Sequence, residues 1–300
     1  NFMLIKMQVG EQDRGELQVN VTDSDNAPIR DARVTISEPE TAINPNSPIE
    51  RLETDVSGQT QIVDLNTPPL EYSLNENNEN MPYANYNIQI EVPGYETENI
   101  RNVEILPDSL SLQNVRMRKR EGEQVENIDI DPHTLYAEYP EKIPEDEIKD
   151  VNEPGEIVLS RVVIPEYVVV HNGTPSSNAR DYYVTYKDYI KNVASSEIYA
   201  TWPRATIEAN VLAIMSFTLN RVYTEWYRNK GYDFTITSST AYDQKWIYGR
   251  NVFEEIDYLV DSIFTNYLSR PGVRQPIFTS YCDGNRTTCR GLSQWGSKSL

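Results

Sequence analysis

The chain has 300 residues, and its 46 Asp and Glu against 27 Lys and Arg give a formal net charge of −19. This acidic balance argues against nucleic acid and anionic membrane surfaces as partners, because both require a basic surface, and no apolar run approaches the ~20 residues that span a bilayer. The length predicts two domains, while two cysteines and two histidines argue against a disulfide scaffold and a His-rich metal site.

Residues 1–120 are predicted to form an all-β sandwich. Leu17, Val19 and Val21 alternate with polar residues, which is the period of a strand with one buried face. Further strand-like runs lie at residues 32–36, 61–65 and 87–92. Turn sequences separate the runs, and no cluster of catalytic or metal-ligating residues stands out among them. A binding or regulatory module is therefore the favoured interpretation.

The same region resembles the carboxypeptidase-regulatory or transthyretin-like sandwich. The residues that carry the resemblance are the first strand and residues 26–29, 32–36 and 54–58. The resemblance implies a small β-sandwich that accompanies a catalytic domain.

Residues 121–163 are predicted to be an acidic linker. Residues 121–156 contain thirteen Asp or Glu against only Lys142 and Lys149, and four prolines interrupt any helix. Such a segment buries too little apolar surface to offset its ordering entropy. It is either a solvated spacer or an accessible processing site for a protease.

Residues 164–300 are predicted to form an α+β domain. A short helix is expected over residues 188–197, and a longer amphipathic helix follows from Pro203 towards Trp226, with Thr201 as a possible cap and Gly231 at its end. A helix is expected from about Val252, and one long helix over residues 252–268 is the alternative to a helix followed by a strand. The expected strands are residues 235–240, 261–267 and 276–281.

Two motifs in this domain carry a resemblance to a known family. Residues Tyr189–Glu197 followed by Trp202-Pro203, and the later run Ser293-Gln294-Trp295-Gly296, resemble the stage II sporulation protein D/amidase-enhancer family. Within it, the spore cortex-lytic enzymes of clostridia are similar over most of residues 164–300, including residues 237–243 and 281–284. In those enzymes a peptidoglycan-binding domain follows, so the chain is expected to be truncated at Leu300.

The resemblance implies a lytic transglycosylase that acts on spore cortex peptidoglycan outside the spore core. Glu197 matches the family's catalytic carboxyl, which first protonates the glycosidic oxygen and then accepts the proton of the muramoyl 6-hydroxyl. We expect burial near Trp202 and Tyr199 to raise the pKa of Glu197. The expected substrate-binding residues are Trp202, Tyr242, Tyr281, Ser293, Gln294 and Trp295, with Trp246 as a further aromatic of the glycan groove.

The sequence departs from the family in two places. The family helix often carries an arginine where this chain reads Met215-Ser216-Phe217-Thr218, and Arg221 is the nearest substitute. Ser239–Tyr242 stands where some relatives have a zinc-binding Cys/His segment, so no metal or cofactor is expected. For Cys282 and Cys289, a disulfide, two free thiols and a metal site with Asp283 remain open.

Two other functions compete with the lytic enzyme: a non-catalytic cell-wall module that enhances an amidase, and an N-acetylmuramoyl-L-alanine amidase. The resemblance also implies a precursor activated by a subtilisin-like germination protease. We expect the N-terminal domain, or part of residues 121–163, to cover the groove around Glu197. The acidity of the linker is expected to place negative charge near that carboxyl and to raise its pKa further.

Overall fold

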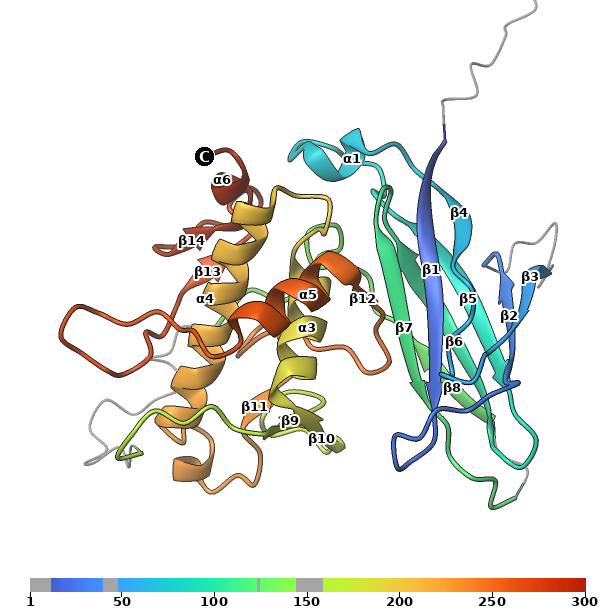
Figure 1. Ribbon diagram of the computed structural model, residues 1–300. Helices are drawn as coiled ribbons and strands as arrows, with labels where there is room; N and C mark the ends of the chain where they lie inside the picture. Colours follow the sequence, from blue (N-terminus) through green and yellow to red (C-terminus); the bar gives the residue numbers. More distant parts are fainter. Residues whose placement is uncertain (1–11, 40–47, 123–124, 144–158) are drawn as a thin grey trace, which may run out of the picture. The chain divides into compact units, whose positions relative to one another are not determined.

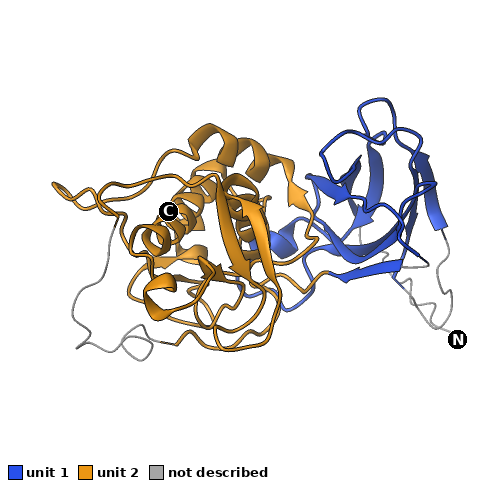
Figure 2. Cartoon of the chain, turned by 90° about the horizontal axis from the view of Figure 1, so that it is seen from below, with its two compact units in different colours: residues 1–129 blue, residues 130–300 orange. Residues whose placement is uncertain are grey.

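The computed structural model describes residues 12–39, 48–122, 125–143 and 159–300 (Figure 1). It is a mixed α/β protein with several β-sheets and, in the described residues, five α-helices. The chain divides into two compact units, residues 1–129 and 130–300, which are coloured separately in Figure 2. Each unit is described by itself below.

Unit 1 contains two sheets. In the first, β1 (Asp13–Thr22) lies between β7 (Leu110–Arg116), to which it is parallel, and β4 (Val63–Thr67), to which it is antiparallel. The second has the order β3-β2-β5-β6-β8. Its strands are β2 (Arg33–Ser37), β3 (Pro48–Glu53), β5 (Ala84–Glu91), β6 (Thr97–Ile105) and β8 (Val125–Asp129). The short helix α1 (Glu71–Leu74) follows β4.

The alternation expected from the sequence sets the core of unit 1. Leu17, Val19 and Val21 of β1 are each 0% exposed, and so are Val34 and Ile36 of β2. Their polar neighbours in the chain point to the other face of the strand, as the period of two requires. The apolar faces of the two sheets together form the core.

Strand β8 lies in the stretch that the sequence analysis assigned to the linker. Residues 97–101 of β6 pair in parallel register with residues 125–129, and Ile128 is buried. The acidic composition misled here, because Ile128, placed between the exposed Asn127 and Asp129, is enough to give the strand a buried face. Residues 123–124 and 144–158 of the expected linker and processing region lie outside the described residues.

We expect a fragment of residues 1–129 to be more stable than a fragment of residues 1–120. The shorter fragment loses the pairing of β8 with β6 and exposes the surface that Ile128 covers, which is worth roughly 1.5–3 kcal/mol for a fully buried side chain of this size. Urea denaturation of both fragments measures the difference. Equal midpoints would show that β8 adds nothing to unit 1.

Unit 2 combines a small sheet with a helical layer. The sheet has the order β10-β9-β11, from β9 (Tyr167–His171), β10 (Asp181–Thr185) and β11 (Ile236–Thr237). The helices are α3 (Tyr186–Glu197), α4 (Arg204–Tyr223), α5 (Glu254–Ile263) and α6 (Gln294–Lys298), with a 3-10 turn at Arg228–Lys230. The remaining strands are β12 (Val252–Phe253), β13 (Tyr281–Cys282) and β14 (Leu292–Ser293).

Helices α3 and α4 begin where the sequence gives start signals. The Thr185 hydroxyl caps α3 by accepting the Asp188 N–H, and Asp188 accepts the Thr185 hydroxyl proton in return. Pro203 is the N-cap of α4, where its missing N–H costs no hydrogen bond, so Thr201 is not the cap. Gly231 adopts a left-handed φ of 84° and ends the 3-10 turn rather than α4.

The strand expected over residues 261–267 is wrong. Helix α5 continues to Ile263, because Ile256, Leu259 and Val260 recur at helical spacing and are all buried. The strand expected over residues 276–281 is reduced to the two-residue β13, and that over 235–240 to β11. In the described part of the chain, no helix is long and apolar enough to cross a membrane.

Candidate functional site

Glu197 is the last residue of α3, and its side chain is buried, with 4% of the residue exposed. The backbone N–H of Lys245 donates to Oε1 over 2.7 Å, while Oε2 is buried and accepts no hydrogen bond of normal geometry from the described residues. Burial raises the pKa of Glu197, against the lowering effects of the Lys245 N–H, the Tyr281 hydroxyl and the charges of Lys142 and Lys245. The expected rise of this pKa is confirmed.

The end of α3 is held by groups from three distant parts of the chain. Its last carbonyls have no partners within the helix. Arg250 donates to the Ser195 carbonyl over 2.6 Å, and Thr134 donates to the Ser196 carbonyl through both its N–H, over 3.0 Å, and its hydroxyl. Gln294 donates to the carbonyl of Glu197 itself over 3.3 Å. These contacts fix the backbone that carries the candidate catalytic carboxyl.

The second motif therefore lies beside the first, although 97 residues separate Gln294 from Glu197. The Ser293 hydroxyl accepts the Gly296 N–H and caps the short helix α6. Gln294 faces inward, with 4% of its surface exposed. In this arrangement Ser293 and Gln294 shape the site, and whether they touch a substrate stays a prediction.

Three aromatic residues form one cluster next to Glu197. The ring centroids of Trp202 and Trp295 are 4.8 Å apart, and Tyr199 packs edge-on against both. All three are buried, with Trp202 3% and Trp295 6% exposed. In this state the rings pack on one another, so stacking of Trp202 or Trp295 on a sugar would require the covering residues to move.

Tyr281 and Tyr242 differ in their relation to Glu197. The Tyr281 hydroxyl faces the carboxyl and accepts a hydrogen bond from Gln244 over 3.0 Å. No hydrogen bond or ring contact joins the Tyr242 side chain to Glu197 in the described residues, and its carbonyl accepts from Arg221. Trp246 is 5% exposed and packs on Tyr182 and Tyr248.

Residues 130–143, called the covering segment below, run across this site within unit 2. Besides the contacts of Thr134 with Ser196, the His133 ring stacks on Tyr199 at 4.5 Å between centroids. Asp131 pairs with Lys245 over 2.7 Å. The segment thus contacts Ser196, which precedes Glu197 in α3, and Tyr199, which lies just beyond the helix. It also contacts Lys245, whose backbone holds the carboxyl.

The far end of the covering segment is also attached. The Ile143 N–H donates to the Ala241 carbonyl over 2.7 Å, and Lys142 lies over the Phe217 ring at 4.7 Å. Lys142 lowers the pKa of Glu197, so the segment brings a cation rather than an anion towards the carboxyl. Six of the linker's acidic residues fall within residues 144–158, which lie outside the described residues, so the expectation that linker acidity raises this pKa stays a prediction.

Sequence patterns did not identify three parts of this site: the covering segment, Lys245 and Gln244. The segment reads as a polar linker, and nothing in its composition shows that His133 and Leu135 become buried. Lys245 acts through its backbone N–H, which every residue except proline carries. A sequence pattern therefore holds no signal for that contact.

Cys282 and Cys289 form a disulfide, which decides between the three possibilities left open. The bridge closes a loop in which Asp283 accepts from the Thr287 N–H over 2.9 Å and pairs with Arg286. Arg286 in turn donates to the Ala137 carbonyl of the covering segment over 2.8 Å. The bridge thus supports a loop that helps hold the segment.

Removing the bridge with Cys282→Ala/Cys289→Ala is expected to lower the free energy of unfolding by about 2 kcal/mol, because a short cross-linked loop constrains the unfolded chain. Urea denaturation of the variant and of the oxidised parent chain gives the difference. An unchanged free energy of unfolding would show that the loop is held equally well without the bridge.

Arg221 has a structural role in unit 2. It is 1% exposed, pairs with the buried Asp243 over 2.8 Å, and lies over the rings of Phe217, Trp226 and Phe278. It therefore neutralises Asp243 rather than replacing the arginine of the family helix near Glu197. No group of three or more metal-ligating side chains occurs in the residues that the structure covers.

His171 is the last residue of β9. Its Nδ1 is 2.7 Å from Asp181 Oδ1, and its Nε2 is 3.2 Å from both the carbonyl and the hydroxyl of Ser177. The Ser177 hydroxyl donates its proton to the Thr174 carbonyl over 2.7 Å. That proton is not directed at the imidazole, so Ser177 and His171 do not form a nucleophile–base pair. Their hydrogen bonds instead stabilise the turn that contains Ser177.

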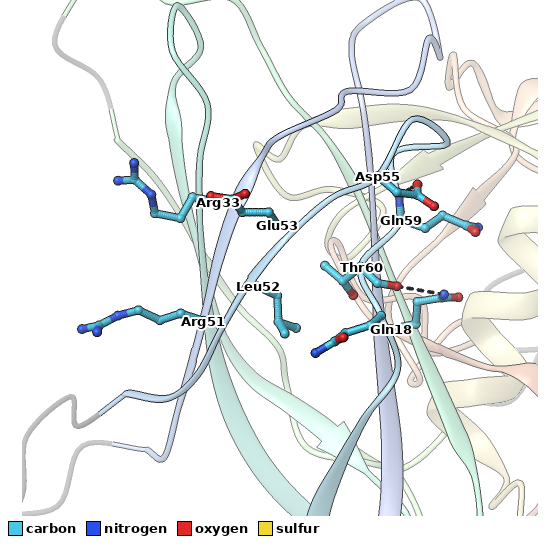
Figure 3. A pocket seen from close by; sticks show the side chains of 9 residues that line it. Gln18, Arg33, Arg51, Leu52, Glu53, Asp55, Gln59 and Thr60 are labelled. Atoms are coloured by element: carbon cyan, nitrogen blue, oxygen red, sulfur yellow. Dashed lines mark hydrogen bonds between the residues drawn. The ribbon is translucent and has the colours of Figure 1, made fainter.

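Unit 1 carries an open hollow lined mostly by polar and charged side chains, shown in Figure 3. Arg33, Arg51, Glu53 and Asp55 surround it, and Gln18 donates to the Thr60 carbonyl at its side. Arg33 pairs with Glu91 over 3.5 Å. These charged side chains are exposed to solvent, in contrast to the buried carboxyl of Glu197.

The chain has only weak similarity to known proteins. No protein family matches the chain, and no curated protein matches it. A catechol 1,2-dioxygenase from Acinetobacter radioresistens is 14% identical over 39% of this chain and 58% of its own, with a TM-score of 0.26. The minor pilin GBS52 of Streptococcus agalactiae is 17% identical over 38% of this chain and 48% of its own, with a TM-score of 0.26. The chain thus spans less than two thirds of either structure.

Proposed function

We propose that the chain is the precursor of a spore cortex-lytic enzyme. In this proposal it is a lytic transglycosylase that cleaves the glycan strands of cortex peptidoglycan during germination and leaves 1,6-anhydromuramoyl ends. The observation that carries the proposal is the buried carboxyl of Glu197, with Oε1 held by the Lys245 N–H and Oε2 accepting no hydrogen bond of normal geometry from the described residues. A buried polar atom without a partner is costly, and such atoms are retained where they take part in chemistry.

The chemistry needs a single carboxyl group. In the first step a proton on Glu197, which the raised pKa favours, passes to the glycosidic oxygen as its bond to the muramoyl C1 breaks. The muramoyl 6-hydroxyl oxygen then bonds to C1, and its proton returns to Glu197. No water enters the product, unlike hydrolysis by a pair of carboxylates.

The covering segment supports the precursor part of the proposal. Glu197 is 4% exposed while residues 130–143 contact Ser196, Tyr199 and Lys245 around it. A glycan strand cannot reach the carboxyl until this segment leaves. A cut by a subtilisin-like germination protease after residue 143 would separate the segment from the α+β lytic domain, whereas the N-terminal sandwich would leave with it.

The proposal places the protein in the cortex and coat region of the spore, outside the core, with cortex peptidoglycan and the protease as its partners. The two competing functions make different products. An amidase would release stem peptides from intact glycan strands, and an amidase-enhancing module would leave the peptidoglycan unchanged by itself.

Mass spectrometry of cortex muropeptides separates these outcomes. Isolated cortex is incubated with the chain after cleavage between residues 144 and 158. Anhydromuramoyl ends support the proposal. New reducing ends, free stem peptides or unchanged peptidoglycan would each contradict it and identify a hydrolase, an amidase or a binding module respectively.

A further inference from the structure

A fully buried glutamine lies between helices α3 and α4, next to the candidate catalytic carboxyl. Gln244 is 0% exposed and makes four hydrogen bonds. Its Oε1 accepts from the Tyr189 hydroxyl over 3.1 Å and from the Thr218 hydroxyl over 2.7 Å. Its Nε2 donates to the Ile214 carbonyl over 3.1 Å and to the Tyr281 hydroxyl over 3.0 Å.

The Ile214 carbonyl fixes which way this amide points. A carbonyl oxygen can only accept a hydrogen bond, so the Gln244 atom beside it must be the nitrogen. Turning the amide over would set two oxygens against each other and leave both unsatisfied in a dry interior, which costs about 1–3 kcal/mol for each group. Hydroxyl groups could adapt to either orientation, but this carbonyl cannot.

The orientation of Gln244 decides where the proton of Tyr281 goes. Because the Tyr281 oxygen accepts from Nε2, its own O–H cannot point back at Gln244. The Glu197 carboxyl is the acceptor that Tyr281 interacts with on its other side. Burial and the neighbouring carboxyl raise the pKa of Tyr281, so the hydroxyl keeps its proton and remains a donor.

We infer that Gln244 and Tyr281 are positioning residues for Glu197, in which the fixed amide turns the Tyr281 hydroxyl proton towards the carboxyl. The inference rests on the proposed function for its catalytic meaning, while the geometry stands without it. It gives Tyr281 a different role from the sugar contact expected from the sequence, since its hydroxyl faces Gln244 and Glu197 and 9% of the residue is exposed.

The arrangement suits a carboxyl that must act first as an acid and then as a base. Burial favours the protonated form that starts the reaction. After the proton has passed to the glycosidic oxygen, the carboxylate is left in a dry site. The Lys245 N–H and the Tyr281 O–H then stabilise it until the muramoyl 6-hydroxyl returns a proton.

The charged and titratable groups around Glu197 are known, so the sign of the effect can be stated. They are Tyr189 of α3, Lys142 of the covering segment, Lys245 of the loop between β11 and β12, and Tyr281 of β13. Tyr281 is among those that lower the pKa of Glu197. Tyr281→Phe removes the hydroxyl that lowers this pKa, while the raising effect of burial remains. The pKa of Glu197 is therefore expected to rise.

Carboxyl titration by NMR tests the inference in the full chain labelled with ¹³C at the Glu side-chain carboxyls. The Glu197 signal is assigned as the one lost in Glu197→Gln. We expect a higher pKa of Glu197 in Tyr281→Phe, and a smaller rise in Gln244→Met, which cannot donate to the Tyr281 oxygen. Tyr186→Phe is the matched control, because the buried Tyr186 hydroxyl has no hydrogen-bond partner in the described residues.

An unchanged or lower pKa of Glu197 in Tyr281→Phe overturns the inference, and so does an equal rise in Tyr186→Phe. If Gln244→Met does not fold, Tyr281→Phe decides alone, since it removes a single oxygen. In the cleaved enzyme, the alkaline limb of the pH–rate profile should move to higher pH in Tyr281→Phe. The titration needs no activity, so it fails or succeeds separately from the proposed function.

Discussion

Replacing Glu197 by Gln is expected to abolish glycan cleavage by the processed chain. Gln is nearly isosteric and can still accept the Lys245 N–H through its oxygen, but it has no proton to give to the glycosidic oxygen. Loss of general acid–base catalysis typically lowers the rate about 10²–10⁴-fold. Release of soluble muropeptides from isolated cortex, followed over time, measures the rate.

The fold should survive this change, because Glu197→Gln also removes a carboxyl whose charged form is disfavoured by burial. Glu255→Gln is a suitable control, since it makes the same substitution at an exposed position of α5. Unimpaired cleavage by Glu197→Gln, with the circular dichroism of the parent chain, would remove Glu197 from the mechanism.

Cutting the chain between residues 144 and 158 is expected to activate cortex lysis. While the chain is intact, the covering segment is held at the site at the millimolar effective concentration typical of a short linker. After the cut, at about 1 µM protein, that concentration falls roughly 10³-fold, so the rate of cortex lysis should rise by up to this factor. An engineered protease site in this stretch allows the same sample to be assayed before and after cleavage.

His133→Ala should give part of the activation without a cut. The His133 ring is fully buried and stacks on Tyr199, so its loss weakens the hold of the segment beside Glu197. Glu138→Ala, at an exposed position of the same segment, should leave the intact chain inactive. Equal activity of the intact and cut chains would refute the covering role, and rescue of the intact chain by salt would make it electrostatic rather than steric.

The sequence was most informative where structure is local. The alternation in β1 was enough to place this strand, because it buries one face, and the start signals and apolar spacing placed α3 and α4, although both helices are buried on most sides. The two motifs at Glu197 and Gln294 were recognised separately, and their contact through a backbone carbonyl was not visible. The strand prediction for residues 261–267 was wrong because helix α5 is short and its apolar residues also suit a strand.

Long-range packing explains what could not be predicted. The covering segment has the composition of a linker, yet it binds through backbone groups and one buried histidine. The role of Gln244 depends on four partners spread from Tyr189 to Tyr281. Such a network is specified by the assembled fold rather than by any spacing in the chain.

Digestion of cortex in water enriched in ¹⁸O tests the central claim most directly. If Glu197 passes its proton to the glycosidic oxygen and recovers one from the muramoyl 6-hydroxyl, the new ends are anhydro sugars, lighter than reducing ends by one water and free of ¹⁸O. The cut chain should give these products, and the cut Glu197→Gln chain should give none. Reducing ends that carry ¹⁸O, or anhydro ends from the Glu197→Gln chain, would contradict the account.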